Sequence, residues 1–284
     1  GYGHLNATFT KSISSDDTVV FKISSTNATE FNKYVYDMAS NGYEKISQNE
    51  INNNLFYTYK NGSTLINAVF FPSQNEVTVT RESVTNLPSS LSAPTYVTKN
   101  TPSITQLKLE ASIKEGMSYV IHLSDGTFFI IDGGWCDNDQ NEADKLYNKL
   151  VALANGNDIV ISGWLFTHCH GDHIGTFNLF VEKYHDMVTI NQLLYNFPAD
   201  IDISNSGSQY MLDNTKQRYT NFKNVIATYL EETEIVKLHS GYKFYYANAE
   251  IEILQTFEDL YPSTVANYDF NSSYTIFTVK IEGQ

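Results

Sequence analysis

The stretch IVISGWLFTHCHGDHIG, residues 159–175, places an apolar run directly before a segment that holds three of the chain's seven histidines. The run 159–167 is typical of a buried strand, and residues 176–187 have the spacing of a helix. A strand that delivers the chain into closely spaced histidines and then into a helix is rare by chance. We therefore read this segment as a functional site rather than as a histidine-rich surface loop.

The spacing of the polar residues in this segment favours metal binding. His168 and His170 are two apart, so at the end of an extended strand they point to the same side. Asp172 and His173 are adjacent and are expected to point apart, toward a second position. Imidazole and carboxylate groups are the usual ligands of zinc. The pattern predicts one or two zinc ions, with manganese or iron as alternatives.

The motif THCHGDHIG resembles the HxHxDH signature of the metallo-β-lactamase superfamily, and the likeness extends upstream to IIDGG at 130–134. The resemblance covers roughly residues 104–284 and implies an α/β fold, the αββα sandwich of that superfamily. It implies that His168 and His170 hold a first metal and that Asp172 and His173 hold a second. Asp132 would orient these ligands through hydrogen bonds.

Within the superfamily the chain looks most like bacterial extracellular or envelope members, such as competence-associated nuclease domains and phosphorylcholine esterases. Asn271 begins an Asn-x-Ser segment similar to theirs. This likeness implies hydrolysis of phosphoester or other ester bonds by a metal-bound hydroxide, with Asp172 as a catalytic residue that orients the nucleophile. The substrate would be a small molecule or an ester of the cell envelope. The alternatives are a β-lactam or amide hydrolase and a non-catalytic binding or scaffold protein.

Two departures from the family pattern bear on the metals. A third histidine usually completes the first site; His239, in KLHSG at a predicted strand end, is the first candidate and His185 the second, although some relatives lack this ligand. The bridging aspartate of a late Gly-Asp pair is missing before Gln284. We interpret the chain as truncated at its C-terminus, with a weak or absent second metal. A late sheet left with an unpaired edge would also favour a homodimer.

Four further residues have competing interpretations. Tyr195 and Asn196 end a strand after the motif, where they line the substrate pocket or pack in the core. Cys169, between two histidines, is expected to point away from the metals and pack. Cys136 follows the Asp132 turn, so a disulfide between the two cysteines is the alternative to free thiols.

The chain divides into two predicted domains. Residues 1–86 read as a small α+β unit of order β-α-β-β-β and unknown role, with a helix over 27–41 and a hairpin signal at Asn61-Gly62. Residues 87–103 are rich in Pro, Ser and Thr and form the predicted linker. Residues 104–284, where strands and helices alternate before a final run of strands, form the metallo-β-lactamase-like domain.

Composition limits the partners. The chain has 284 residues, 42% hydrophobic and 18% charged, with a formal net charge of −14. Tight nucleic-acid binding is not expected, because no basic run is present. No apolar stretch reaches the roughly 20 residues that a membrane span needs. Because the sequence starts without Met, we expect that an export signal was removed and that the protein is extracellular or envelope-attached in a bacterium, with the cytoplasm as the alternative.

Overall fold

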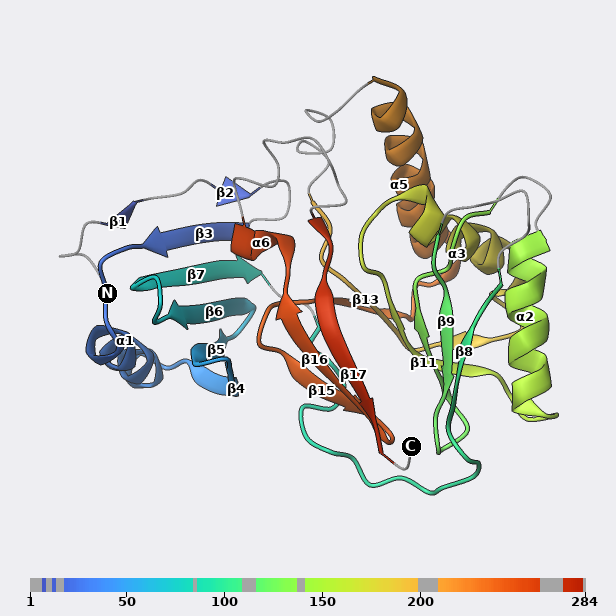
Figure 1. The fold of residues 1–284 in the computed structure, drawn as a ribbon, viewed down its shortest axis with the longest axis horizontal. Helices are drawn as coiled ribbons and strands as arrows, with labels where there is room; N and C mark the ends of the chain where they lie inside the picture. The colour runs from blue at the N-terminus through green and yellow to red at the C-terminus, as the bar shows by residue number, and fades with distance from the viewer. Residues whose placement is uncertain are drawn as a thin grey trace.

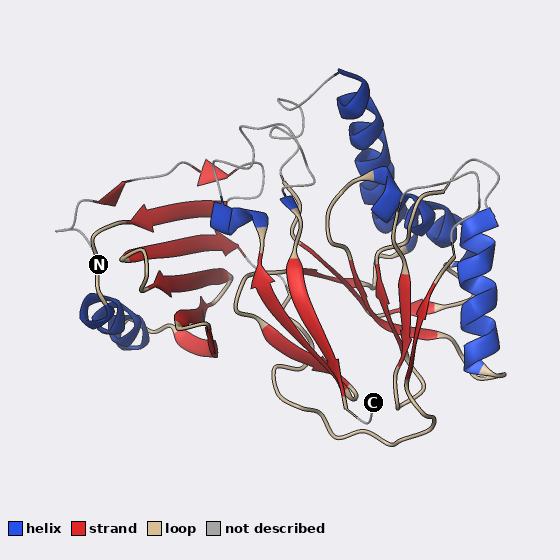
Figure 2. Cartoon of the chain, viewed as in Figure 1, coloured by secondary structure: helices blue, strands red, loops and turns tan. Residues whose placement is uncertain are grey.

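The computed structural model describes residues 7–8, 12–13, 18–83, 86–108, 116–136, 141–198, 209–260 and 273–282. Its described strands form three sheets (Figures 1 and 2). The sheet of β15–β17 lies between the N-terminal sheet and the sheet of β8–β14, which carries α2, α3 and α5 on its far side. This arrangement confirms the predicted α/β class.

The N-terminal sheet has the strand order β1-β3-β7-β6-β5-β4, with β2 paired to β3. Its strands are β1 (Ala7–Thr8), β2 (Ser12–Ile13), β3 (Thr18–Ile23), β4 (Glu44–Ile51), β5 (Asn54–Asn61), β6 (Thr64–Phe71) and β7 (Glu76–Ser83). The predicted helix is confirmed as α1 (Ala28–Ser40), which buries Phe31, Val35 and Met38. Its first turn is capped by the side chain of Asn27, which accepts from two backbone N–H groups.

β4 was not predicted. Its sequence EKISQNEI is largely polar and shows none of the alternation that marks a half-buried strand. It forms because it pairs along its length with β5, at the edge of the sheet, where both faces can stay polar. Tertiary pairing here overrides a weak local signal.

The second sheet runs in the order β14-β13-β11-β10-β9-β8, with β12 beside β11. Its strands are β8 (Ser103–Gln106), β9 (Tyr119–His122), β10 (Phe128–Ile131), β11 (Val160–Leu165), β12 (Thr189–Ile190), β13 (Gln192–Tyr195) and β14 (Glu234–Lys237). The strands β10, β11, β13 and β14 run parallel to one another, so their carboxyl ends lie at the same end of the sheet. The apolar sequences of β10 and β11 suit strands covered on both faces.

Two apolar layers cover this sheet. On one face lie α2 (Asn141–Ala154), α3 (Gly171–Tyr184) and α5 (Gln209–Tyr229), around a cluster of aromatic rings from Trp164, Phe166, Phe177, Phe180 and Phe222. On the other face lies the third sheet, which consists of β15 (Lys243–Tyr246), β16 (Ala249–Gln255) and β17 (Ile276–Ile281). The short helix α6 (Phe257–Leu260) follows β16 in the chain. The predicted helix after the motif begins earlier than expected, at Gly171 rather than at residue 176.

The predicted linker lies against the second sheet and the third. Leu87 and Leu91 pack on the core between those sheets, and Ser89 bonds to Gln192. Farther along, the backbone N–H of Lys99 donates to the carbonyl of Ser124 at 2.7 Å. The segment is therefore held in place by packing and backbone hydrogen bonds.

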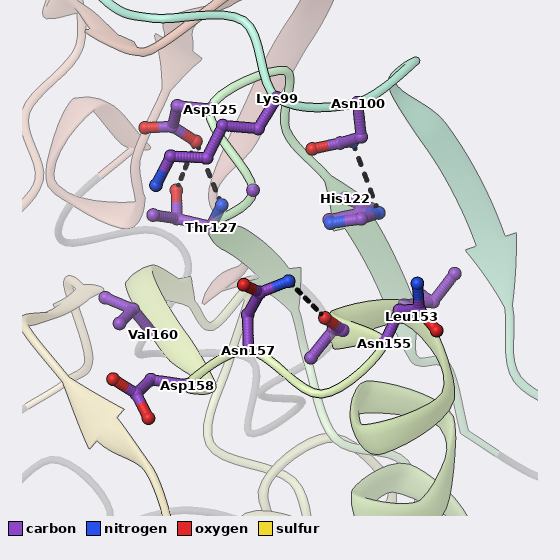
Figure 3. Close-up of a pocket in the computed structure, with 12 residues that line it drawn as sticks. Lys99, Asn100, His122, Asp125, Thr127, Leu153, Asn155, Asn157, Asp158 and Val160 are labelled. Atoms are coloured by element: carbon purple, nitrogen blue, oxygen red, sulfur yellow. Dashed lines mark hydrogen bonds between the residues drawn. The ribbon is translucent and has the colours of Figure 1, made fainter.

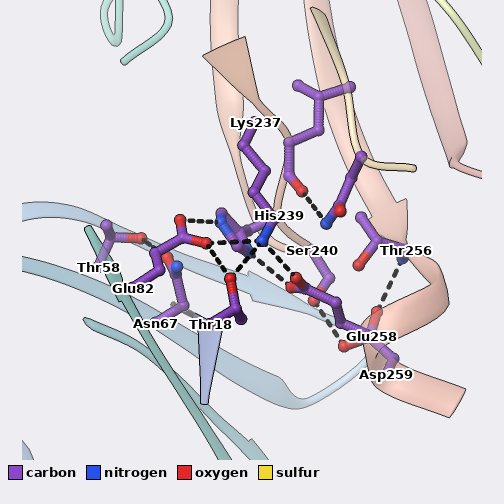
Figure 4. A network of polar contacts seen from close by, with 12 residues as sticks. Thr18, Thr58, Asn67, Glu82, Lys237, His239, Ser240, Thr256, Glu258 and Asp259 are labelled. Carbon is purple, nitrogen blue, oxygen red and sulfur yellow. Dashed lines mark hydrogen bonds and ion pairs between the residues drawn. The ribbon is translucent and has the colours of Figure 1, made fainter. Parts of the chain in front are cut away.

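A buried ionic network joins the N-terminal sheet to the rest of the chain (Figure 4). Nε2 of His239 lies 2.6 Å from Glu82 of β7, and Nδ1 lies 3.0 Å from Glu258 of α6. Lys237 contacts the same two carboxylates at 2.8 and 3.0 Å. Both ring nitrogens of His239 therefore face carboxylates, and the structure does not give this residue the predicted role of third metal ligand.

The charges of this network stabilise one another in a dry environment. Burial alone would lower the pKa of His239, but Glu82 and Glu258 outweigh it and raise that pKa to about 10. Burial raises the pKa of Glu258, yet Lys237 and His239 bring it down to about 2. Tyr242 and Asp259 also lie against the network, and burial raises the pKa of Asp259 to about 6. His239 is thus an imidazolium that connects two parts of the fold.

A close backbone approach lies beside this network. Gly241 has φ +84°, and a methyl group added there would stand 2.2 Å from Cβ of Phe56 in β5. Asn49 of β4 donates to the carbonyl of Gly241 at 3.2 Å. Only glycine permits this contact between the N-terminal sheet and the loop before β15.

We predict that Gly241→Ala lowers the free energy of unfolding by at least about 3 kcal/mol, because it combines an unfavourable φ with overpacking. Gly62→Ala is the matched control: φ is +55° and no atom lies within 4 Å of the added methyl group. That variant should lose only about 1 kcal/mol. Urea denaturation measures both, and equal losses would contradict the close contact.

We predict that His239→Gln destabilises the protein by roughly 3–5 kcal/mol near neutral pH, since it removes one of the two cations, His239 and Lys237, that contact the buried carboxylates. The folded pKa is raised from 6.5 to about 10, so the stabilising contribution is complete below 6.5 and is lost as pH rises through 10. The difference in unfolding free energy between wild type and variant should therefore narrow over that window, by up to about 1.4 kcal/mol per pH unit.

Denaturation curves at about pH 6 and about pH 9 test this linkage. Lys33→Gln, which removes an exposed ion pair with Asp37 on α1, serves as a control and should cost under about 1 kcal/mol. A difference for His239→Gln that stays constant with pH would show that His239 is not charged in the folded protein.

Candidate metal centre

The motif residues occupy the end of β11 and the first turn of α3. After β11 the backbone N–H of Phe166 still bonds to Leu194, and the carbonyl of Thr167 accepts from Thr275. His170 has extended backbone and directly precedes α3; its carbonyl accepts from the N–H groups of His173 and Ile174. The strand end thus places His168 and His170, and the helix places Asp172 and His173.

The structure brings the four predicted ligands together. The ring centroids of His168 and His173 are 3.9 Å apart, and those of His168 and His170 are 4.8 Å apart. Asp172 joins them through Oδ2, which lies 3.3 Å from Nε2 of His173. The expectation that Asp172 and His173 point apart is wrong, because both sit in one helical turn rather than in a loop, and their side chains meet.

The carboxylate of Asp132 fixes this cluster through hydrogen bonds. It follows β10, is fully buried and adopts φ +51°, a conformation that aspartate tolerates better than most residues. Its Oδ1 accepts from the backbone N–H of Thr167, and its Oδ2 accepts from the Thr167 hydroxyl and from Nδ1 of His173, all at 2.8 Å. The carboxylate therefore fixes the start of the motif and the ring of His173 at the same time.

Thr167 extends this support to His168. Its hydroxyl proton goes to Asp132, so the same oxygen accepts from Nδ1 of His168 at 3.0 Å. An Nδ1–H imidazole carries its lone pair on Nε2, the form in which histidine binds a metal. The role of Thr167 could not be predicted from the sequence beyond its position directly before His168.

Charges within the cluster are coupled. Burial lowers the pKa of His173, but hydrogen bonds and charge from Asp132 and Asp172 outweigh it and raise the pKa to about 9. Burial tends to raise the pKa of Asp172, and the hydrogen bond and charge of His173 lower it overall. Burial raises the pKa of Asp132, against the opposing effect of the three hydrogen bonds that it accepts. His173 and Asp172 thus form an ion pair.

The donor chemistry fits a metal ion, since three imidazoles and one carboxylate are gathered on two adjoining elements. Within the described ranges, no three His, Cys, Asp or Glu side chains already stand in coordinating positions. Two of the proposed ligands already contact each other, since Nε2 of His173 lies 3.3 Å from Oδ2 of Asp172 and the two groups share a proton when His173 is charged. A metal would replace that proton.

The other predicted site residues lie elsewhere. Tyr195 packs against Phe197 and Phe222, and burial raises its pKa to about 12. The buried amide of Asn196 donates to the carbonyl of Leu238 at 2.8 Å. Both therefore have the core role that was the alternative to lining a pocket. Asn271 falls outside the described residues.

The remaining histidine candidate and both cysteines serve packing. His185 bonds through Nδ1 to the carbonyl of Val181, and its ring lies on Tyr229. Cys136 and Cys169 are buried free thiols, so they do not form the alternative disulfide. Cys169 belongs to the core beneath the helices, and burial raises its pKa to about 12.

A hollow of about 400 Å³ lies at the opposite end of the sheet (Figure 3). It is lined by residues that precede β10 and begin β11, among them Asp125, Thr127 and Val160. The motif follows the other end of β11, roughly 20 Å along a six-residue strand. His122 in this hollow stacks on Phe128 and contacts Asn100, so it belongs to the wall and not to the metal cluster.

Residues 114–246 match the model of the metallo-beta-lactamase superfamily. A search of curated protein sequences finds no match to the chain. Similar solved structures include a candidate metallo-beta-lactamase from Thermotoga maritima (14% identity, 65% of this chain and 75% of that one, TM-score 0.37). They also include the metallo-beta-lactamase fold protein YhfI from Bacillus subtilis (16%, 55% and 54%, 0.34) and the diiron beta-hydroxylase CmlA from Streptomyces venezuelae (14%, 59% and 26%, 0.32).

These structural likenesses are distant, and the assignment depends on the family model and on the motif within it. The matched segment contains Asp132 and the whole of THCHGDHIG, and it ends in β15. Through residues 114–246, the chain belongs to the metallo-beta-lactamase superfamily.

Proposed function

We propose that the chain is a metal-dependent hydrolase of phosphoester or other ester bonds. Metal-dependent hydrolysis is the general activity of the superfamily. The observation that supports it best in this chain is the convergence of His168, His170 and His173 with Asp172, held from below by Asp132. Such a set of side chains has no evident role in packing.

The proposed ligands are His168, His170, Asp172 and His173, with zinc as the first choice and manganese or iron as alternatives. A bound ion would supply a Lewis acid that polarises the ester and activates water. Asp132 keeps Nδ1 of His173 protonated, so that Nε2 faces the centre. Asp172, beside His173, accepts a hydrogen bond from the attacking water and orients it.

The substrate and its location follow from the same proposal. We propose a small-molecule or cell-envelope ester, met outside the cell or at its envelope in a bacterium. None of the helices in the ranges that the structure describes is long and apolar enough to cross a bilayer.

A homodimer remains a prediction. Among the described strands, β17 lies at the edge of its sheet, where a strand of a second copy could pair with it.

We predict that His170→Ala abolishes tight zinc binding and reduces hydrolysis of bis(p-nitrophenyl) phosphate and p-nitrophenyl acetate at least about 100-fold, because a ligand is lost. His185→Ala is the matched control, since its ring contacts Tyr229 and the carbonyl of Val181. Metal content after dialysis and initial rates measure both variants. Wild type that takes up no metal and hydrolyses neither ester would favour the binding or scaffold alternative. Activity that survives in His170→Ala would show that hydrolysis does not depend on a metal held by His170.

We predict that Asp132→Asn weakens zinc binding about 10- to 100-fold, because the neutral amide no longer holds His173 by a charged hydrogen bond. Competition against a fluorescent chelator measures the affinity. Asp37→Asn, at an exposed ion pair on α1, removes the same charge at the surface and should leave the affinity unchanged. Equal affinities for wild type and Asp132→Asn would show that Asp132 does not orient a ligand.

A further inference from the structure

The segment 116–118, directly before β9, lies against the first turn of α3. Gly116 has φ +111°, and a methyl group added there would overlap the carbonyl oxygen of Asp172 and stand 2.9 Å from the backbone nitrogen of Trp135. Non-bonded carbon and oxygen atoms need roughly 3.3 Å. Both crowded atoms belong to the backbone, so a change of rotamer cannot relieve the overlap. Only glycine lets this segment lie so close to a proposed metal ligand.

The remainder of the segment 116–118 is anchored in the fold. Met117 packs on the apolar cluster between the second and third sheets. The hydroxyl of the buried Ser118 donates to the carbonyl of Asp132 at 3.4 Å, and its own carbonyl accepts from the N–H of Leu107 at 3.0 Å. The strand β9, which follows at once, pairs with β8 and β10. A methyl group at Gly116 would therefore act mainly on the turn of α3.

The same turn of α3 also contacts the loop after β10. The backbone N–H of Gly133 donates to the carbonyl of His173 at 2.7 Å. Two adjacent proposed ligands thus each have a glycine at their carbonyl: Gly133 bonds to His173, and Gly116 leaves room for Asp172. Because metal–ligand distances vary by only about 0.2 Å, backbone contacts at this turn bear directly on metal binding.

We propose that Gly116 is a positioning residue for Asp172. Because it has no side chain, the segment 116–118 can support the turn from which the Asp172 carboxylate reaches Nε2 of His173, at 3.3 Å. A methyl group there would displace the turn by roughly 0.5–1 Å, which is more than a metal site tolerates. This inference rests on the proposed function, since it takes Asp172 to be a metal ligand.

The first test measures the zinc affinity of Gly116→Ala by competition against a fluorescent chelator. A displaced ligand should weaken zinc binding about 10- to 100-fold. Gly156→Ala, with φ +87° and no atom within 4 Å of the added methyl group, controls for backbone strain. Gly241→Ala, whose methyl group overlaps Phe56 of the N-terminal sheet, controls for overpacking and lost stability.

Both controls should keep the wild-type zinc affinity within about twofold, because neither residue contacts a proposed ligand. An affinity of Gly116→Ala that equals the affinity of either control would overturn the proposal.

The second test determines whether the effect passes through the carboxylate. The variant Asp172→Ala keeps the three histidines of the cluster. Adding Gly116→Ala to it should weaken zinc binding no more than about twofold further, because changes that act through one group are not additive. A loss as large as in the wild-type background would show that Gly116 supports the turn as a whole and does not position Asp172.

A milder variant covers the case in which Gly116→Ala does not fold. Ser118→Ala removes the hydrogen bond to the carbonyl of Asp132 and so loosens the segment 116–118. Its zinc affinity should fall about 3- to 10-fold, and this loss should disappear when Asp172→Ala is also present. An unchanged affinity, or a loss that persists without the Asp172 carboxylate, would contradict the proposal.

The two proposals fail in different ways. Zinc binding by wild type without hydrolysis of either ester would overturn the hydrolase, while a weakened affinity in Gly116→Ala alone would still support the positioning role. Hydrolysis by wild type, together with equal zinc affinities in Gly116→Ala and Gly156→Ala, would overturn only the positioning role.

Discussion

The carboxylate of Asp132 is the contact on which the geometry of the metal centre depends. Asp132 directly follows β10, and its three hydrogen bonds reach Thr167, just after the neighbouring strand β11, and the ring of His173 on α3. The carboxylate of Asp132 thus fixes the position of α3 relative to the carboxyl ends of β10 and β11. Without it, Thr167 and His173 would each lose a partner in a site from which water is largely excluded.

Much of this arrangement was readable from the sequence, because its signals are local. The buried strand, the HxHxDH spacing and the upstream Asp-Gly-Gly turn predicted the fold class and the four converging side chains. The pairing of Asp172 with His173 was missed because α3 starts at Gly171, five residues before the start that its apolar pattern indicates.

His239 shows the limit of analogy. Its place at a strand end before a glycine suits a loop ligand, yet the fold gives both of its ring nitrogens to carboxylates. One of those carboxylates, Glu82, comes from the N-terminal sheet, which has no counterpart in the family pattern that suggested the ligand. A residue whose partner lies more than 150 positions away cannot be assigned from its own neighbours. The same network explains why the N-terminal sheet is fixed to the rest of the chain by charge as well as by packing.

Anomalous diffraction at the zinc edge, from a crystal of the protein soaked in zinc, would locate the metal directly. We expect a peak among His168, His170, Asp172 and His173, with Nδ1 of His173 still bonded to Asp132 and His239 still between its two carboxylates. No peak at that cluster, or a peak beside His239 instead, would contradict it.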